Sequence, residues 1–338
     1  GGANVMVDDA DFSGAKFHGG ADFRNADFRY ANFNETRFLN ETKFNKVRFE
    51  GGLTFNEAYV SEGVQFKGAY FVGDIEFKPQ PLESKCFLDL TKATIESGVI
   101  SQPESGSAFY NLTQATVGDI ELEKSKSRYQ LFDYFLFRNT DFDGFDFSMH
   151  RGYLTKNDWK IHEISMSEED FDLGFDFSLD TEDLETTYLK AKNSANAVGD
   201  NKAASEFFIR EMKYRRRQYR EMIFQSSGNP SPLEWLKAGE KWIANFTCGY
   251  GERPSKVIGM SVFFVVAFSI VFGALGIDLP SQGVIPIAVY SIQAYVSLIV
   301  GLPQGSTLLI NLLTAIEGFI GAFFIALFVF ALTRSVHR

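Results

Sequence analysis

Residues 21–49 read ADFRNADFRYANFNETRFLNETKFNKVRF, and a phenylalanine stands at every fifth or sixth position. The spacing extends on both sides, from Phe12 to Phe77, with Val60 in one of the phenylalanine positions. A small or β-branched residue lies two positions before most of these central residues. From Phe33 onward they form two interleaved series of period eleven: Phe33, Phe44, Phe55, Phe66 and Phe77 in one, and Phe38, Phe49, Val60 and Phe71 in the other.

This spacing fits neither a helix, with its period of 3.6, nor a long strand, with its period of 2. A period of five fits one short straight segment followed by a corner, and four such sides close a square coil. Residues 87–95 (FLDLTKATI) resemble residues 109–117 (FYNLTQATV), an offset of 22 that equals one coil with two sides of five and two of six. The sequence therefore predicts a β-helix of about five coils over residues 10–122, with phenylalanine inside.

The pattern resembles the pentapeptide-repeat family, whose motif is A(D/N)LXX, often with phenylalanine at the centre. The resemblance implies a right-handed quadrilateral β-helix over residues 1–125, although the six-residue sides depart from the strict motif. The alternative is a generic β-rich domain with an aromatic bias. Residues 126–181 repeat the pattern only in FDGFDFS (142–148) and FDLGFDFS (171–178), so we expect an irregular acidic cap there. EF-hand spacing is absent from this acidic segment, which argues against a calcium loop.

Composition excludes several classes of protein. The formal net charge is −10, which argues against a protein that neutralises nucleic-acid phosphates, although an acidic rod could instead mimic DNA. The two cysteines, Cys86 and Cys248, cannot form a disulfide scaffold or an all-cysteine zinc site. No nucleophile–base pair, metal cluster or phosphate-binding glycine loop is recognisable, so we expect neither an enzyme nor a cofactor.

Residues 182–230 predict a helical hairpin linker with a turn at 199–201. The second helix carries a basic run, Arg215–Arg217 and Arg220. Two interpretations stay open for this run: contact with anionic lipid headgroups, or a solvated helix face that contacts the acidic N-terminal part. Residues 231–250 predict an amphipathic helix at the membrane interface, with a soluble packing helix as the alternative.

The C-terminal part predicts a membrane domain over residues 251–338. Residues 257–277 carry no charge and at 1.5 Å per residue cover about 30 Å, enough for one crossing. Residues 307–333 form a second apolar run, interrupted only by Glu317. The segment between these two spans, residues 283–303, is also apolar.

Basic residues predict the topology of these segments. Arg253 and Lys256 flank the first span, and Arg334 and Arg338 flank the last. Lys and Arg mark the cytoplasmic side of a membrane protein. Two crossings with a re-entrant segment between them place both basic clusters on that side, whereas three crossings would place the C-terminal cluster outside. We therefore expect a multi-pass protein of the cell membrane with both termini in the cytoplasm.

The C-terminal part therefore has a first span, a re-entrant helix, an extended return and a second span. This order of segments resembles the two-transmembrane pore domain of the potassium-channel superfamily. The order of all segments is similar to a family of prokaryotic pentapeptide-repeat ion-channel proteins, which implies a homotetramer around a pore. Alignment of the pore helix places residues 297–303 on the potassium filter motif T-x-G-Y-G-D. This chain has no glycine at either of the two positions where the motif has one, and no Asp follows. The candidate filter residues are Ser297, Leu298, Ile299, Val300, Gly301 and Leu302.

The departure from the motif predicts weak or absent selectivity for potassium, and the identity and sign of the permeant ion stay open. Glu317 is expected to be hydrogen-bonded behind the filter, with exposure to the ion path as the alternative. Its candidate partners are Tyr290, Gln293 and Ser297.

Small residues on the last span, with Gly318 and Gly321 first among them, allow either close helix packing or a gating hinge. The candidate inner-pore residues are Ala322, Ile325 and Val329. The alternative function is a membrane-anchored scaffold that conducts no ions.

Overall fold

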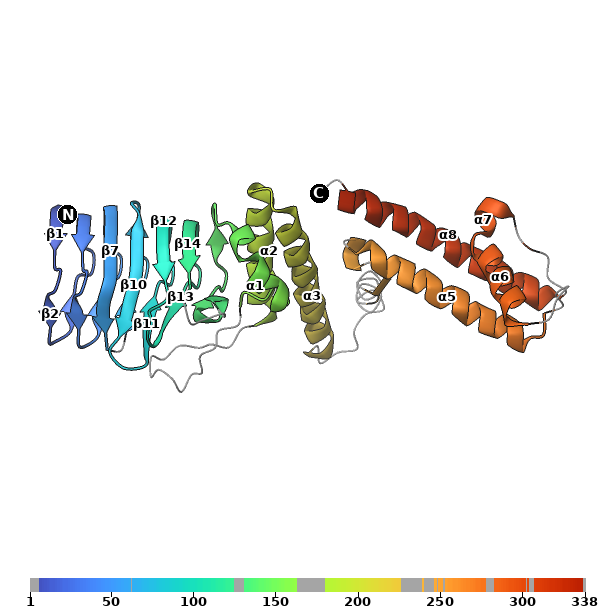
Figure 1. The fold of residues 1–338 in the computed structure, drawn as a ribbon, viewed down its shortest axis with the longest axis horizontal. Coiled ribbons are helices and arrows are strands. Elements are labelled where there is room, and N and C mark those ends of the chain that lie inside the picture. Colours follow the sequence, from blue (N-terminus) through green and yellow to red (C-terminus); the bar gives the residue numbers. More distant parts are fainter. Residues whose placement is uncertain are drawn as a thin grey trace. The chain divides into compact units, whose positions relative to one another are not determined.

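The computed structural model describes residues 6–61, 63–124, 131–162, 180–225, 239, 246–247, 249–251, 253–277, 283–301, 303 and 307–336. The chain divides into two compact units, Gly1–Gln218 and Tyr219–Arg338. The first unit holds a β-solenoid capped by helices, and the second holds the apolar helices (Figure 1). Two predicted features lie largely or wholly outside the described residues. They are the interfacial helix, residues 231–250, and the second repeat-like segment, residues 171–178.

The solenoid is built from parallel strands that stack on one another from coil to coil. Each strand residue pairs with the residue about 22 positions later, as Arg48 does with Tyr70 and Thr94 with Thr116. The first sheet runs in the order β1 (Met6–Asp11), β4 (Asp27–Asn32), β7 (Arg48–Val60), β10 (Ile75–Pro81), β12 (Thr94–Ser101), β14 (Thr116–Glu123) and β16 (Asp141–Phe142), with β2 (Lys16–Phe17), β5 (Arg37–Phe38) and β9 (Tyr70–Phe71) off this path. The second runs in the order β15 (Phe135–Leu136), β13 (Ser107–Asn111), β11 (Lys85–Asp89), β8 (Gly63–Gln65), β6 (Thr42–Lys43) and β3 (Ala21–Asp22).

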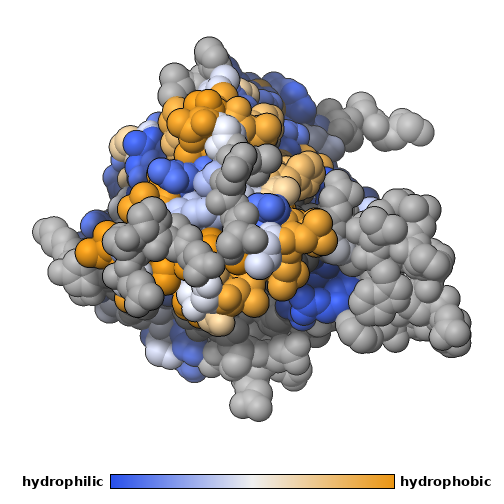
Figure 2. All heavy atoms as spheres, turned by 90° about the vertical axis from the view of Figure 1, so that its right-hand side faces the viewer, coloured by the Kyte–Doolittle hydropathy of each residue, from blue (hydrophilic) through white to orange (hydrophobic). Residues whose placement is uncertain are grey.

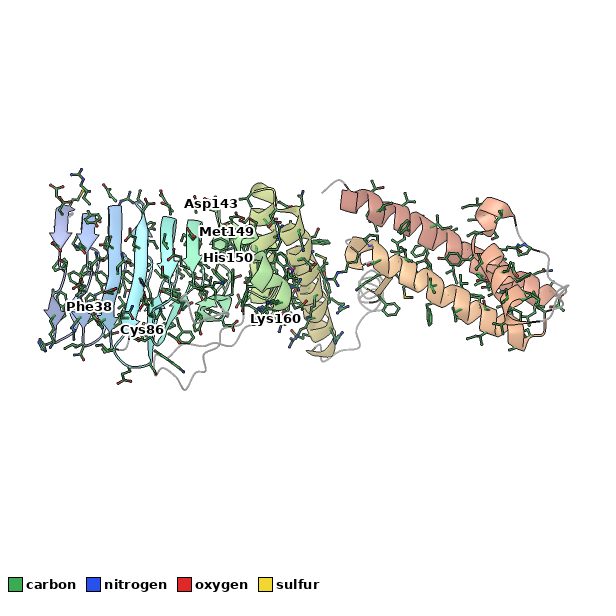
Figure 3. All side chains as sticks on the ribbon, in the orientation of Figure 1. Phe38, Cys86, Asp143, Met149, His150 and Lys160 are labelled. Carbon is green, nitrogen blue, oxygen red and sulfur yellow. The ribbon has the colours of Figure 1, made fainter. Side chains whose placement is uncertain are left out.

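Phenylalanine ladders fill the solenoid, as the spacing predicts. Phe44 is fully buried and stacks on Phe23 and on Phe66, each with ring centroids 4.8 Å apart. Phe38 and the free Cys86 are labelled among the interior side chains in Figure 3. Burial removes the aromatic surface from water, and the offset rings add a favourable quadrupole contact, so each coil supports the next.

The corners of the coils hold residues in the left-handed backbone region. Asn25, Glu35 and Lys46 have φ values of 60°, 59° and 58°, respectively. Their spacing of ten or eleven residues repeats that of the phenylalanines because each left-handed residue turns the chain between two sides. Only glycine adopts this region without a steric cost, so the corners carry modest backbone strain.

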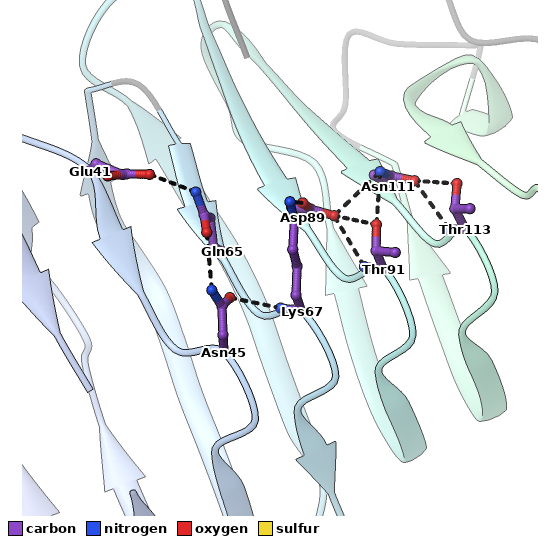
Figure 4. A network of polar contacts seen from close by, with 8 residues as sticks. All are labelled: Glu41, Asn45, Gln65, Lys67, Asp89, Thr91, Asn111 and Thr113. Atoms are coloured by element: carbon purple, nitrogen blue, oxygen red, sulfur yellow. Dashed lines mark hydrogen bonds and ion pairs between the residues drawn. The ribbon is translucent and has the colours of Figure 1, made fainter. Parts of the chain in front are cut away.

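Polar side chains, several of them buried, form a second ladder beside the aromatic core (Figure 4). The Asn111 amide donates to Asp89 Oδ1 at 3.3 Å, and the Thr91 hydroxyl donates to the same oxygen at 2.5 Å. Lys67 Nζ lies 3.1 Å from the other carboxylate oxygen of Asp89, which is itself buried. Consecutive coils are therefore tied together outside the aromatic core as well as within it.

The solenoid has about six turns among the described residues, one more than the sequence analysis predicts. The extra turn includes β15 and β16, which lie in the segment predicted to be an irregular cap. The register lengthens there, so that Thr116 pairs with Asp141, and the fixed 22-residue offset no longer identifies the coil.

Helices close the C-terminal end of the solenoid. The described residues here include η1 (Leu131–Tyr134), η2 (Phe147–His150), α1 (Arg151–Lys156), α2 (Thr181–Ala197) and α3 (Asn201–Gln225). Phe207 of α3 packs edge-on against Phe147 at 4.7 Å and against Trp159 at 5.5 Å, within the same hydrophobic core as the coils. Arg138 donates to Asp183 at 2.6 Å, which joins the last coil to α2. The α2–α3 hairpin is thus a cap with a shared core rather than a separate linker.

The second unit contains η4 (Gly249–Gly251), α5 (Pro254–Ala274), α6 (Val284–Tyr295), α7 (Ser297–Val300) and α8 (Leu308–Val336). By length and composition, α5 and the Leu308–Thr333 part of α8 could each cross a membrane. Their exposed residues are mostly hydrophobic, and orange residues cover much of the end nearest the viewer in Figure 2. A soluble surface rarely exposes apolar area on this scale, which is compatible with a membrane-associated protein.

Candidate functional site

The short apolar helix α6 packs against both α5 and α8, and α5 and α8 also pack against each other. Ala294 and Tyr290 of α6 are buried in this arrangement, whereas Val284, Ile285 and Val289 are exposed. A helix of 12 residues spans about 18 Å, too little to cross a bilayer alone. These contacts are compatible with the predicted re-entrant segment.

Hydrogen bonds join α6 to both long helices. The Tyr295 hydroxyl donates to Ser261 Oγ of α5 at 2.6 Å. The hydroxyls of Tyr290 and Thr314 of α8 lie 2.9 Å apart. Each of these bonds satisfies polar groups that would otherwise be costly in an apolar environment, so they fix the position of α6 between its neighbours.

Glu317 is fully buried at the centre of this contact. Its Oε1 accepts a hydrogen bond from the Ser291 hydroxyl of α6 at 2.5 Å, and no described group donates to its Oε2. The Ser291 oxygen also lies 2.9 Å from the Val265 carbonyl of α5. Glu317 is thus buried and hydrogen-bonded to α6, while its position relative to an ion path stays a prediction.

Ser291 was not among the predicted partners of Glu317. Tyr290 bonds to Thr314 instead, Gln293 is exposed, and Ser297 is buried against α8. Helical spacing carried the missing signal, because residues 287, 291 and 294 share one face of α6 with the buried Tyr290.

Gly318 and Gly321 are sites of close helix packing. A Cβ at Gly318 would overlap the Ser297 hydroxyl, and one at Gly321 would overlap the Tyr295 carbonyl oxygen. The helix α8 continues through both positions. A larger residue at either position would therefore displace α7 or α6, and a role of these glycines as a gating hinge stays a prediction.

The candidate filter segment begins as a helical turn, which differs from the extended return expected. Residues 297–300 form α7, and the N–H of Gly301 donates to the Ser297 carbonyl at 2.7 Å. The N–H groups of Ile299 and Val300 donate to the Val296 carbonyl in the same turn. The carbonyls of Val296 and Ser297 therefore accept hydrogen bonds within a helical turn, which differs from the row of inward-pointing carbonyls in a potassium filter. Leu302 lies outside the described residues.

Side chains of α7 are exposed on the second unit. Leu298, Ile299 and Val300 are each about 70% exposed, and Gly301 has a φ of 90°, a left-handed value that ends the turn. These three side chains add to the exposed hydrophobic surface of the second unit.

The exposed surface of α8 is divided into two strips by helical spacing. One strip is mostly small or polar, with Val329 as a larger apolar member, and it includes two of the predicted inner-pore residues: Asn311, Ala315, Ala322, Ala326 and Val329. The other is bulky and apolar: Leu312, Ile316, Phe319, Phe323 and Phe330. Ile325, the third predicted inner-pore residue, is half-buried beside the packed face.

Among the described residues, no group of three His, Cys, Asp or Glu side chains is placed to hold a metal ion. On the solenoid, a surface groove is lined by side chains that include Glu35, Glu57, Glu76 and Glu123. Two of these carboxylates accept hydrogen bonds, Glu76 from Asn56 at 2.6 Å and Glu123 from the Ser101 hydroxyl at 2.7 Å.

Comparison with known proteins identifies the N-terminal part. A family model described as pentapeptide repeats (9 copies) matches residues 4–47. No curated protein and no solved structure matches the chain. Together with the stacked coils, the match supports a repeat β-solenoid in the N-terminal part of the chain. The chain is thus a repeat protein with two helices that could cross a membrane, which is compatible with a membrane-associated protein.

Proposed function

We propose that the chain is the subunit of a homotetrameric ion channel, with a cytoplasmic pentapeptide-repeat domain and a pore domain similar to that of potassium channels. The observation that carries this proposal is the short apolar helix α6, hydrogen-bonded to two potential spans and followed by an exposed apolar turn. A single chain of this kind supplies only part of a pore wall, so several copies must surround an axis.

In this proposal the small-residue strip of α8 faces the axis and its bulky strip faces lipid. Ala322 and Val329 leave room for water and ions near the axis, whereas Phe319 and Phe323 on the other strip would fill it. Glu317 lies behind the pore wall, where its bond to Ser291 holds α6 against α8.

The pore is proposed to discriminate weakly between potassium and sodium. A potassium filter replaces the hydration shell with evenly spaced carbonyl oxygens. The carbonyls of Val296 and Ser297 are already bonded within α7, and the segment from Ser297 to Leu302 carries a single glycine. Ions crossing this constriction would therefore keep much of their water, and the pore would select by size and local field alone.

Both termini are proposed to face the cytoplasm. Arg253 and Lys256 precede or begin α5, and Arg334 lies near the end of α8, so two crossings place both basic ends on the same side.

Thiol accessibility tests the proposed axis. In a Cys248→Ser background, Ala322→Cys and its neighbour Phe323→Cys place a thiol on the two different strips of α8. A hydrophilic, membrane-impermeant methanethiosulfonate reagent should block current through Ala322→Cys and leave Phe323→Cys unchanged. Equal block of both variants, or block of Phe323→Cys alone, would contradict the proposed face of α8.

The second candidate is a membrane-anchored scaffold, and the helical turn α7 favours it. If residues 297–300 keep their internal hydrogen bonds in the assembled protein, no carbonyl ring forms and the centre can stay closed. Current from the purified protein in bilayers distinguishes the two functions, because a scaffold gives none.

A further inference from the structure

The α2–α3 hairpin carries two groups of basic side chains, and those of the first group form ion pairs within the cap. Arg210 lies 2.7 Å from Asp158, and Arg215 lies 2.6 Å from Glu185 of α2. Arg210 is nearly buried, and the whole group belongs to the interior surface of the cap. These side chains are already committed to structural ion pairs.

The second group lies on another face of the same helix. Lys213, Arg216, Arg217 and Arg220 follow the spacing i, i+3, i+4 and i+7 of a single helical stripe, which we name the basic face of α3. Their side chains are exposed or half-exposed, and the buried Tyr214 points to the cap on a different side. Within the described part of the chain, Lys213, Arg216 and Arg220 form no ion pair. Three neighbouring cations outside the ion pairs of the described residues are unexpected in a chain whose net charge is −10.

We propose that the basic face of α3 binds anionic phospholipid headgroups of the membrane that the chain's own helices cross. The inference rests on the membrane insertion of the proposed function, but not on ion conduction. About 28 residues separate the end of α3 at Gln225 from the start of α5 at Pro254, so the chain limits the distance between them to about 100 Å. This tether raises the effective concentration of the headgroups around α3. A cluster of four cations tethered to a membrane span is a feature that an anionic leaflet attracts.

The test uses the full chain in nanodiscs and a fluorophore on the basic face. Arg217→Cys in a Cys248→Ser background carries the label, and the remaining Cys86 is buried, with a thiol pKa raised by burial, so it does not compete. Lipids with a nitroxide on the headgroup report contact by quenching. We expect strong quenching in phosphatidylcholine mixed with phosphatidylglycerol, little in phosphatidylcholine alone, and loss of quenching near 1 M salt, where the Debye length is about 3 Å.

Two triple variants separate this contact from a general charge effect. Lys213→Gln/Arg216→Gln/Arg220→Gln should weaken the bound state about a hundredfold, since each cation near an anionic surface contributes about fivefold. The matched control, Lys16→Gln/Arg29→Gln/Lys46→Gln, removes three exposed cations from the solenoid and should leave quenching unchanged.

Other outcomes would overturn the inference. Equal quenching in both lipids, or the same quenching with the first triple variant, would show that the basic face does not bind headgroups. Absence of quenching in either lipid would assign the face to another occupant, such as the acidic surface of a second copy. Failure of the chain to insert into nanodiscs would instead contradict the proposed function itself.

Discussion

Replacing Phe44 with alanine should strongly lower the free energy of unfolding of the solenoid, because this ring lies in the middle of a ladder of stacked phenylalanines. Phe44 is fully buried between Phe23 and Phe66, with centroids 4.8 Å away on each side. Truncation of a buried phenylalanine costs about 3–5 kcal/mol. Loss of two stacked contacts, at about 0.5–1.5 kcal/mol each beyond buried area, places the expected cost toward the upper end of that range.

The matched control is Phe12→Ala. Phe12 is only half-buried, and its one parallel stacked neighbour is Phe33 at 4.9 Å. We expect this variant to lose about half as much free energy of unfolding as Phe44→Ala, since burial scales with area.

Urea unfolding of residues 1–225, followed by far-ultraviolet circular dichroism, measures both changes. This fragment contains the solenoid and the α2–α3 cap, which share one hydrophobic core. If Phe44→Ala lost less than about 1 kcal/mol, or no more than Phe12→Ala, the aromatic ladder would not be what stabilises the coils.

Three further predictions concern other parts of the chain. Lys46→Ile should lower the free energy of unfolding by about 1 kcal/mol or more, whereas Lys46→Gly should be close to neutral in the same assay, because φ at this corner is 58°. Burial lowers the pKa of His150 to about 4, so the unfolded chain binds the proton more tightly than the folded chain. The free energy of unfolding should therefore fall as the pH drops from about 6.5 to 4. The difference between the urea midpoints at pH 7 and pH 5 should be smaller in His150→Gln than in the unaltered chain. An unchanged slope in that variant would assign the pH dependence to other groups. Gly321→Ala should lower the melting temperature of the detergent-solubilised protein, because the new methyl group overlaps the Tyr295 carbonyl, while Gly259→Ala, which meets no atom, should not; equal effects would contradict the close packing of α6 on α8.

The solenoid could be predicted from the sequence because its determinants are local and repeated. A phenylalanine at every fifth or sixth position specifies both the corner and the buried ring, and Phe38 and Phe49 occupy the places that the spacing assigns. The prediction failed where the register changed, at the turn that pairs Thr116 with Asp141. The role of the hairpin as a cap also escaped prediction, since it depends on contacts such as Phe207 with Trp159, which are distant in sequence.

The candidate pore segment was less predictable. Two long apolar helices and a short one between them follow directly from composition. The partner of Glu317 was assigned to the wrong residue, since three polar side chains were considered without their helical register, which favours Ser291. The conformation of residues 297–300 was expected from a family motif that this chain does not share, and the structure has a helical turn there.

Recording from purified full-length protein in planar bilayers tests the ion-channel proposal most directly. With asymmetric KCl, we expect discrete openings whose reversal potential gives the sign of the permeant ion. If that ion is a cation, exchange of potassium for sodium on one side should shift the reversal potential only slightly, because α7 and the single glycine, Gly301, cannot supply regular carbonyl rings. Bilayers that demonstrably contain the protein but show no openings would contradict the channel, and strong selectivity for potassium over sodium would contradict the proposed constriction.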